Sequence, residues 1–154
     1  MKILMVCLGN ICRSPMAQGI LEKKVADAGL QDQITVDSAG TSDYHIGDPP
    51  DLRAVEKSRA YDIDISHYRG RQFEKDDFDE FDRIFAMDFS NYENILRLSR
   101  DTADSQKVEM ILNLNNPNSN MSVPDPYYGG EEGFENVYQL LDAACDRLME
   151  QIQS

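Results

Sequence analysis

A cysteine and an arginine six positions apart form the segment of the chain best suited to chemistry. Cys7 and Arg13 enclose a short loop that directly follows an apolar run, residues 2–6. A loop of this length between a strand and a helix can point successive backbone N–H groups at one tetrahedral anion. A thiolate beneath phosphorus and a guanidinium across two of its oxygens can then make and break a phosphocysteine. The spacing therefore indicates phosphoryl transfer, with Cys7 as nucleophile and Arg13 as phosphate ligand.

The residues around this loop support the same interpretation. Ser14 and Pro15 predict a helix start, because serine is a preferred N-cap and proline has no N–H to leave unpaired in the first turn. Gly9 permits a close approach of backbone to anion, and Asn10 tolerates a left-handed conformation. The helix N-terminus and the arginine both favour the thiolate form of the cysteine. The alternative for these residues is a buried structural cysteine beside a solvent-facing arginine.

The nonapeptide of residues 7–15, combined with Asp125-Pro126-Tyr127-Tyr128, resembles the low-molecular-weight protein tyrosine phosphatase family. The resemblance also covers the chain length and segments 37–40 and 87–88, and so spans nearly the whole chain. It implies hydrolysis of phosphotyrosine in protein or peptide substrates. It also implies that the phosphate is surrounded by the loop residues Leu8, Gly9, Asn10, Ile11, Cys12 and Ser14.

The resemblance assigns supporting roles as well. It implies that the Ser14 hydroxyl donates to the Cys7 sulfur and helps it leave in the second step. Asn10, Ser38 and His67 match positions in a hydrogen-bond network that holds the shape of the family's loop. For His67 a partly exposed loop histidine is an equally open interpretation, and Ser38 is as readily an ordinary turn residue.

Asp125 is the candidate general acid and base. Loss of an unassisted tyrosine anion from phosphorus is slow, so the reaction needs a proton donor above the pocket. Pro124 and Pro126 restrict the backbone on either side and can hold the carboxyl group in place. The same carboxylate can later take a proton from the attacking water. A solvated turn aspartate is the alternative.

Two tyrosines are candidate walls of the pocket. Aromatic side chains can form a deep slot for an aryl leaving group while excluding water. Tyr127 matches a wall tyrosine of the family, whereas Tyr44 falls where some members carry tryptophan, which leaves the peptide preference open. Surface packing is the alternative for Tyr44. The family also offers a precedent for phosphorylation of Tyr127 and Tyr128.

The other cysteines have different predicted roles. Cys12 lies on the same loop as Cys7, so a disulfide between them could protect an oxidised nucleophile from irreversible oxidation. Cys145 falls on the apolar side of the last expected helix and is expected to be a small core residue. Cys7, Cys12 and Cys145 lack paired metal-ligand spacing, so we expect neither a metal nor another cofactor.

Size and composition narrow the class of protein. The 154 residues predict a single domain, 1–154, large enough to bury a core without disulfides. The formal net charge of -13 argues against nucleic-acid and membrane partners and suits basic or neutral flanks on a substrate. An odd number of cysteines, with no leader or membrane-spanning stretch, predicts a cytoplasmic protein. The family resemblance allows a monomer or a weak dimer.

Alternating strand-like and helical patterns predict an α/β fold: a parallel sheet with helices on both faces and a phosphate-binding loop after the first strand. The resemblance implies four strands. Strands are expected at residues 2–6, 34–37, 83–87 and 108–112, and helices at 15–28, 48–60, 88–98 (from Asp88 or Ser90) and 133–152. Leu52, Val55 and Ala60 are expected to face inward. In such sheets ligands bind at the carboxyl ends of the strands, where Cys7, Ser38, Asp88 and the loop of residues 113–132 would meet.

Three other functions remain open. Arsenate reductases share this type of loop, but members with that activity carry a cysteine pair after the third strand, and residues 81–100 contain none. A protein arginine phosphatase would typically have threonine at the position of Ile11, so this isoleucine favours tyrosine phosphate. A non-catalytic module that binds phosphorylated partners would need neither Cys7 nor Asp125.

Overall fold

The computed structural model describes residues 1–154 except the side chain of Tyr128, so the expectation for that tyrosine lies outside the described residues. Its centre is a parallel sheet of four strands in the order β2-β1-β3-β4. The fold class predicted from the sequence is confirmed. The strands are β1 (Lys2–Cys7), β2 (Thr35–Gly40), β3 (Arg83–Ala86) and β4 (Val108–Met110).

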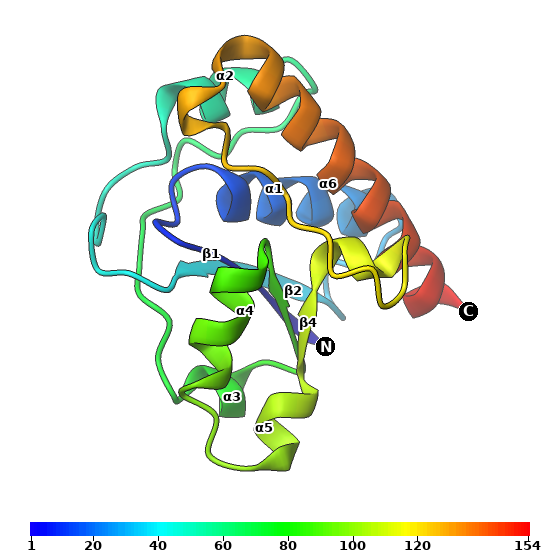
Figure 1. Ribbon diagram of the computed structural model, residues 1–154. Coiled ribbons are helices and arrows are strands. Elements are labelled where there is room, and N and C mark those ends of the chain that lie inside the picture. Colours follow the sequence, from blue (N-terminus) through cyan, green and yellow to red (C-terminus); the bar gives the residue numbers. More distant parts are fainter.

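Helices cover both faces of the sheet (Figure 1). On one face lie α1 (Arg13–Asp27), α2 (Leu52–Arg59) and the long α6 (Gly130–Gln153), with α1 packed against both other helices. On the other face lie α3 (Asp77–Glu80), α4 (Phe89–Leu96) and α5 (Thr102–Gln106). Two short 3₁₀ helices, η1 (Ile111–Leu114) and η2 (Pro126–Tyr128), lie between β4 and α6.

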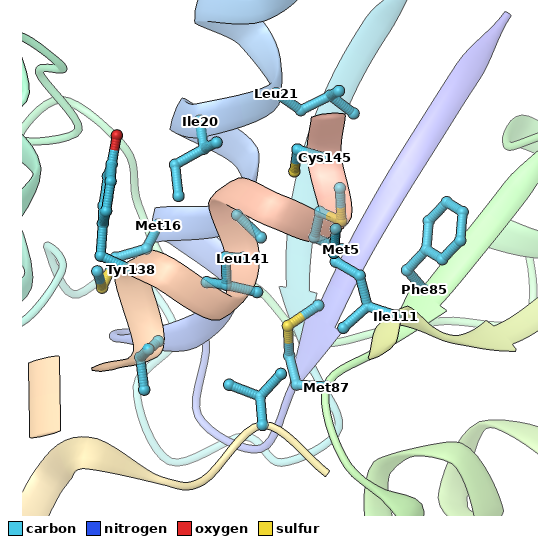
Figure 2. Close-up of a cluster of buried hydrophobic side chains, with 14 of the residues drawn as sticks. Met5, Met16, Ile20, Leu21, Phe85, Met87, Ile111, Tyr138, Leu141 and Cys145 are labelled. Atoms are coloured by element: carbon cyan, nitrogen blue, oxygen red, sulfur yellow. The ribbon is translucent and has the colours of Figure 1, made fainter. Parts of the chain in front are cut away.

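Alternation along β1 divides the core into two layers. Ile3, Met5 and Cys7 belong to the cluster beneath α1 and α6, whereas Leu4 and Val6 belong to the cluster on the opposite face. Figure 2 shows the first layer, where side chains from α1 and α6 meet those of the sheet. Its labelled residues are Met5, Met16, Ile20, Leu21, Phe85, Met87, Ile111, Tyr138, Leu141 and Cys145. Cys7 therefore stands at the end of a strand that is buried on both faces.

The start of α1 differs from the prediction. The helix begins at Arg13 with Cys12 at the N-cap, and no side chain caps it. Ser14, the predicted N-cap, lies within the first turn and is fully buried. Its hydroxyl contacts Cys7 and Asn10 instead of capping the helix. The prediction of Ser14 as the N-cap was therefore wrong, because Cys12 occupies the cap position and the Ser14 hydroxyl is engaged by Cys7 and Asn10.

Other helices and strands also begin or end at residues that differ from the prediction. α2 begins at Leu52, later than predicted, because the Asp51 carboxylate caps it by accepting from the Arg53 N–H. Leu52 and Ala60 are exposed, and Ala54 is buried beside Val55. The prediction of the inward face of this helix was therefore correct for Val55 and wrong for the other two residues. β2 continues to Gly40, and α6 starts at Gly130. α4 is capped by Asp88, one of the two predicted caps.

Candidate active site

A pocket of about 360 Å³ opens at the carboxyl end of β1. Its lining combines the loop after β1 with two segments distant in sequence, the loop after β2 and the segment around η2. The lining residues are Cys7, Leu8, Gly9, Ile11, Cys12, Arg13, Tyr44, His45, Asp125 and Tyr127. Cys7, Arg13 and Asp125, the three residues predicted to carry out the chemistry, therefore meet in one pocket.

Cys7 contacts two polar groups at the base of the pocket. The Ser14 hydroxyl oxygen lies 3.0 Å from the Cys7 sulfur. The Asn10 backbone N–H donates to the same sulfur at 3.3 Å. The Asn10 side-chain amide donates to the Ser14 oxygen at 2.8 Å, which leaves the hydroxyl hydrogen to point at the sulfur or at the Ala39 carbonyl, 3.4 Å away. These contacts suit a negatively charged sulfur acceptor.

Asn10 holds the loop in its unusual shape. Its φ of 58° places it in the left-handed region, as its residue type predicted. Its side-chain oxygen accepts from the backbone N–H of Arg71 at 3.1 Å. The buried amide thus joins the loop to the segment that precedes α3. Arg71 is a supporting residue that the sequence did not reveal.

The end of β2 approaches the same loop very closely. A Cβ atom at Gly40 would lie 2.6 Å from the Leu8 carbonyl oxygen, a distance that real Cβ atoms do not tolerate. Just beyond Gly40, the N–H groups of Thr41 and Ser42 donate to the carbonyls of Cys7 and Leu8. Glycine is therefore required at the end of β2 because the backbone of the catalytic loop occupies the space of a side chain.

Arg13 is buried and held by two acceptors. One of its terminal nitrogens donates to Asp88 at 2.8 Å and to the carbonyl of Val123 at 3.0 Å. Burial alone would lower the pKa of the guanidinium, but the nearby anionic groups, chiefly Cys7 and Asp88, outweigh burial and raise it. The arginine therefore stays charged and pre-oriented at the pocket. Asp88 lies where the sequence placed it, at the crevice, with a role in fixing Arg13.

Cys12 is the second thiol of the pocket. It is buried, and burial, reinforced by the negative charge of Asp51, raises the pKa of its thiol. Cys12 therefore stays protonated at neutral pH and is a poor nucleophile. Cys145 is fully buried in the core between α6 and α1, as predicted.

Asp125 faces Arg13 across the pocket. One of its carboxylate oxygens lies 4.0 Å from an Arg13 nitrogen, and the other accepts from the Tyr127 N–H at 3.0 Å. That second contact makes Asp125 the N-cap of η2. Half of its side chain is exposed, so the carboxyl group is accessible both to a bound substrate and to water.

Arg53 secures the segment that carries Asp125. Its guanidinium donates to both oxygens of Asp51 and to the carbonyl of Tyr127, at 2.8 Å for the carbonyl. The same group lies 5.1 Å from the ring centre of Tyr127 and 4.9 Å from that of Phe134. Arg53 thus joins the start of α2 to η2 and α6. A single arginine at a helix start gave no sequence signal for this role.

Aromatic side chains line the pocket. Tyr44 and Tyr127 both line it and both remain exposed. His45 lines it too, with its ring packed over Gly9, where a Cβ atom would lie 3.0 Å from the histidine Cδ2. The ring is oriented by a 3.1 Å contact between its Nδ1 and Asp48. His45 was missed, although its position next to Tyr44 was a signal.

Ser38 and His67 are not brought to the loop. The Ser38 hydroxyl donates to the Gln18 side chain at 2.7 Å, which joins β2 to α1. His67 is exposed, and its ring contacts Tyr68 edge-on. The described hydrogen bonds of Asn10 do not include either residue, so their supporting role stays a prediction. Ser38 lies in β2 opposite Met5 of β1.

Neither a metal centre nor a membrane span is found in the described part of the chain. Among these residues, no group of three or more histidine, cysteine or acidic side chains is arranged to hold a metal ion. No helix that the structure describes combines the length and apolar character needed to cross a bilayer.

The buried cysteine, the fixed arginine and the facing carboxylate define a cysteine-dependent phosphatase of the α/β class. The sequence model of the family described as low molecular weight phosphotyrosine protein phosphatase matches residues 2–154. The human protein of that name is 40% identical over 149 residues, covering 97% of this chain and 94% of the human one. A Synechocystis relative whose name places it in the same class is 50% identical over 151 residues, covering 97% and 94%. The chain belongs to the low molecular weight phosphotyrosine protein phosphatase family.

Solved structures agree with this assignment. A protein tyrosine phosphatase from Entamoeba histolytica, with Hepes in its active site, superposes with a TM-score of 0.93 and 37% identity, covering 99% of this chain and 97% of that one. A Drosophila arginine phosphatase superposes with a TM-score of 0.92 and 32% identity, covering 100% of this chain and 99% of the Drosophila one. The fold is therefore shared by phosphatases that are named for two different phosphorylated side chains.

Proposed function

We propose that this chain hydrolyses phosphotyrosine in proteins or peptides through a phosphocysteine intermediate on Cys7. The observation that carries the proposal is the convergence of Cys7, Arg13 and Asp125 on one pocket with aromatic walls. Each of the three supplies a part that the reaction needs: a nucleophile, a phosphate ligand and a proton donor.

In the first step the Cys7 thiolate attacks phosphorus. A P–S bond forms as the bond between phosphorus and the tyrosine oxygen breaks, and Asp125 gives its proton to the departing oxygen. Arg13 and the inward N–H groups of the loop neutralise the charge on the other phosphate oxygens. Because Asp88 and the Val123 carbonyl already orient Arg13, little reorganisation accompanies the step.

In the second step water replaces the thiol. Asp125, now ionised, takes a proton from the attacking water as the P–O bond forms and the P–S bond breaks. The Cys7 sulfur leaves as a thiolate, and the Ser14 hydroxyl, 3.0 Å away, can donate to it. Inorganic phosphate and the original protonation state of the enzyme are restored.

Arginine phosphatase activity is the second candidate, favoured by the likeness to the Drosophila enzyme. The pocket residues argue for tyrosine. Ile11 lines the pocket and offers no side-chain hydrogen bond to a guanidino group, whereas Tyr44 and Tyr127 suit an aryl ring. Arsenate reduction is disfavoured because the third cysteine, Cys145, lies fully buried in the core.

Phosphate release from matched phosphotyrosine, phosphoserine and phosphoarginine peptides tests the proposal, with EDTA and a thiol reductant present. We expect the phosphotyrosine peptide to have the highest kcat/KM, because only its ring reaches between the aromatic walls. A higher value for phosphoarginine would transfer the assignment to arginine phosphatases. If none of the three peptides were turned over, a non-catalytic binding module would be the better interpretation.

Arg53→Met should show whether the segment carrying Asp125 must be held in place. Methionine keeps an unbranched stem but loses every donor to Asp51 and Tyr127. We expect kcat/KM for a phosphotyrosine peptide to fall roughly tenfold, because small displacements of a catalytic group are costly. Nitrophenyl phosphate, which needs less acid assistance, should lose much less.

The matched control for Arg53 is Arg147→Met, on the exposed face of α6, where the arginine pairs with Glu150. This variant should keep the activity of the original chain toward both substrates. Equal losses for both substrates in Arg53→Met would mean that Arg53 supports only the fold, and no loss would remove the role altogether.

Three further expectations remain part of the proposal. A reversible Cys7–Cys12 disulfide is supported by the presence of both thiols in one pocket. A cytoplasmic location is supported by three unpaired cysteines, since the reaction needs a reduced nucleophile. A single domain is supported by the continuous core beneath α1 and α6, and a monomer or weak dimer is what we expect of it in solution.

A further inference from the structure

Large apolar side chains that are exposed on the described surface gather at one place. Apart from Met1 at the N-terminus, three of them line the active-site pocket, and the other four lie within two positions of a residue that lines it or that contacts Arg13 or Tyr127. We call this set the rim: Leu8, Tyr44, Ile46, Leu52, Phe89, Met121 and Tyr127. Scattered exposed apolar residues need no explanation, but a ring of them around a pocket is typical of a binding surface.

One arc of the rim is built by the loop after β2 and the start of α2. Tyr44 lines the pocket, and Ile46 lies two residues further along the same loop. Leu52, with 67% of its surface exposed, begins α2 beside Arg53, whose guanidinium is bonded to the Tyr127 carbonyl. This arc therefore continues directly from the aromatic walls.

The other arc lies on the side of Arg13. Phe89, 47% exposed, directly follows Asp88, which accepts a hydrogen bond from Arg13. The Phe89 N–H donates to the Ser122 hydroxyl at 3.2 Å, which brings the start of α4 against the residue that follows Met121. Phe89, whose ring stacks on that of Tyr92 with centroids 6.0 Å apart, and Met121 thus lie on two segments that are hydrogen-bonded to each other next to the residues that hold Arg13.

The charged groups near the rim do not favour acidic ligands. Three cations, Arg13 in the pocket and Arg53 and Lys57 on α2, are already engaged by carboxylates: Arg13 by Asp88, Arg53 by Asp51, and Lys57 by Glu131 and Glu135. Asp43 and Asp48, on the loop that carries Tyr44 and Ile46, are exposed carboxylates. The whole chain has a formal net charge of -13. Acidic residues beside a phosphotyrosine would therefore be repelled.

We propose that the rim docks the residues that flank phosphotyrosine in the substrate, and that it selects apolar, non-acidic flanks on both sides. This inference rests on the proposed function. A tyrosine that reaches Cys7 must carry its chain out across the rim, because the rim is continuous with the walls of the pocket. One flank would contact Phe89 and Met121, and the other would contact Tyr44, Ile46 and Leu52.

Three phosphotyrosine peptides of equal length test the proposal, with two leucines, two serines or two glutamates on each side of the tyrosine. Nitrophenyl phosphate, which has no flanks, serves as the reference substrate. We expect kcat/KM to be at least about tenfold higher for the leucine peptide than for the serine peptide. The glutamate peptide should be the poorest substrate, and more so at low salt.

Variants of Phe89 and Met121, the arc on the side of Arg13, then test whether these two residues cause the preference for leucine flanks. Phe89→Ser with Met121→Ser should remove most of the advantage of the leucine peptide, while turnover of nitrophenyl phosphate changes less than about twofold. Phe89→Leu is the matched control, since it stays apolar, and it should keep the preference. Thermal unfolding of each variant would verify that the fold is intact.

The outcomes separate this inference from the proposed function. Turnover of none of the four substrates would overturn the proposed function itself. Efficient turnover with equal kcat/KM for the three peptides, or a leucine preference unchanged in the double variant, would overturn the docking role. Sedimentation velocity would measure the oligomeric state of the original chain and of the double variant. If the original chain were a dimer and the double variant a monomer, the rim would be an interface with a second copy, and the docking role would be overturned.

Discussion

Cys7→Ser is expected to lower kcat for a phosphotyrosine peptide at least about 10³-fold while inorganic phosphate still binds. A serine hydroxyl must lose its proton before it can attack phosphorus. The two described contacts of the Cys7 sulfur are the Ser14 hydroxyl and the Asn10 N–H, and neither is a base. Arg13 and the loop N–H groups are unchanged, so the anion site should persist.

Steady-state kinetics and calorimetric titration with phosphate would measure the two effects of the Cys7 variant separately. Acid quenching of the original chain during turnover should trap one phosphoryl group on the peptide that contains Cys7. Cys145→Ala, in the core, is the control cysteine and should keep its activity. Retained turnover in Cys7→Ser, or a phosphoryl group on Cys12, would contradict the mechanism. If the serine variant fails to unfold cooperatively, Cys7→Ala provides a second test.

The layered fold was predictable because its signals are local. The apolar run of β1 and the helical spacing of apolar residues in α6 each appear within one continuous segment. α3 and α5 were not predicted, since each is only one turn long and mostly polar. Their buried carboxylates, Asp77 and Asp104, pair with Arg71 and Arg100. Such short helices depend on ion pairs with residues outside the helix, and the periodicity of apolar residues in the sequence does not predict these ion pairs.

The candidate site was predictable only where its signals are local. Cys7 and Arg13 lie on one short loop, and the prolines beside Asp125 mark its segment, so residue type and spacing were sufficient. The contacts that position these groups cross long stretches of chain: Asn10 meets Arg71 across 61 positions, and Arg13 meets Val123 across 110. Arg53 and His45 were missed for this reason. Ser38 and His67 were assigned by matching positions, and the described contacts do not support the role inferred that way.

Asp125→Asn is expected to lower kcat/KM for phosphotyrosine by about 10²-fold to 10⁴-fold, the usual contribution of a general acid. Asparagine has the same shape, and its side-chain oxygen can still accept from the Tyr127 N–H, so η2 keeps its cap. What it loses is the transferable proton. The loss should therefore depend on the leaving group, large for tyrosine and much smaller for nitrophenol, which departs readily as an anion.

The comparison of leaving groups distinguishes acid catalysis from a change in charge. Removing the Asp125 carboxylate also deletes a negative charge 4.0 Å from Arg13, which by itself would strengthen phosphate binding and lower KM for every substrate alike. Asp32→Asn, an exposed position outside the pocket lining, removes one charge without touching the site. Equal losses of kcat/KM, which reports only the steps up to departure of the leaving group, for both substrates in Asp125→Asn would refute the acid role. A loss confined to the poorer leaving group would place the proton on Asp125 in the first step, because only that step breaks the bond to the leaving oxygen.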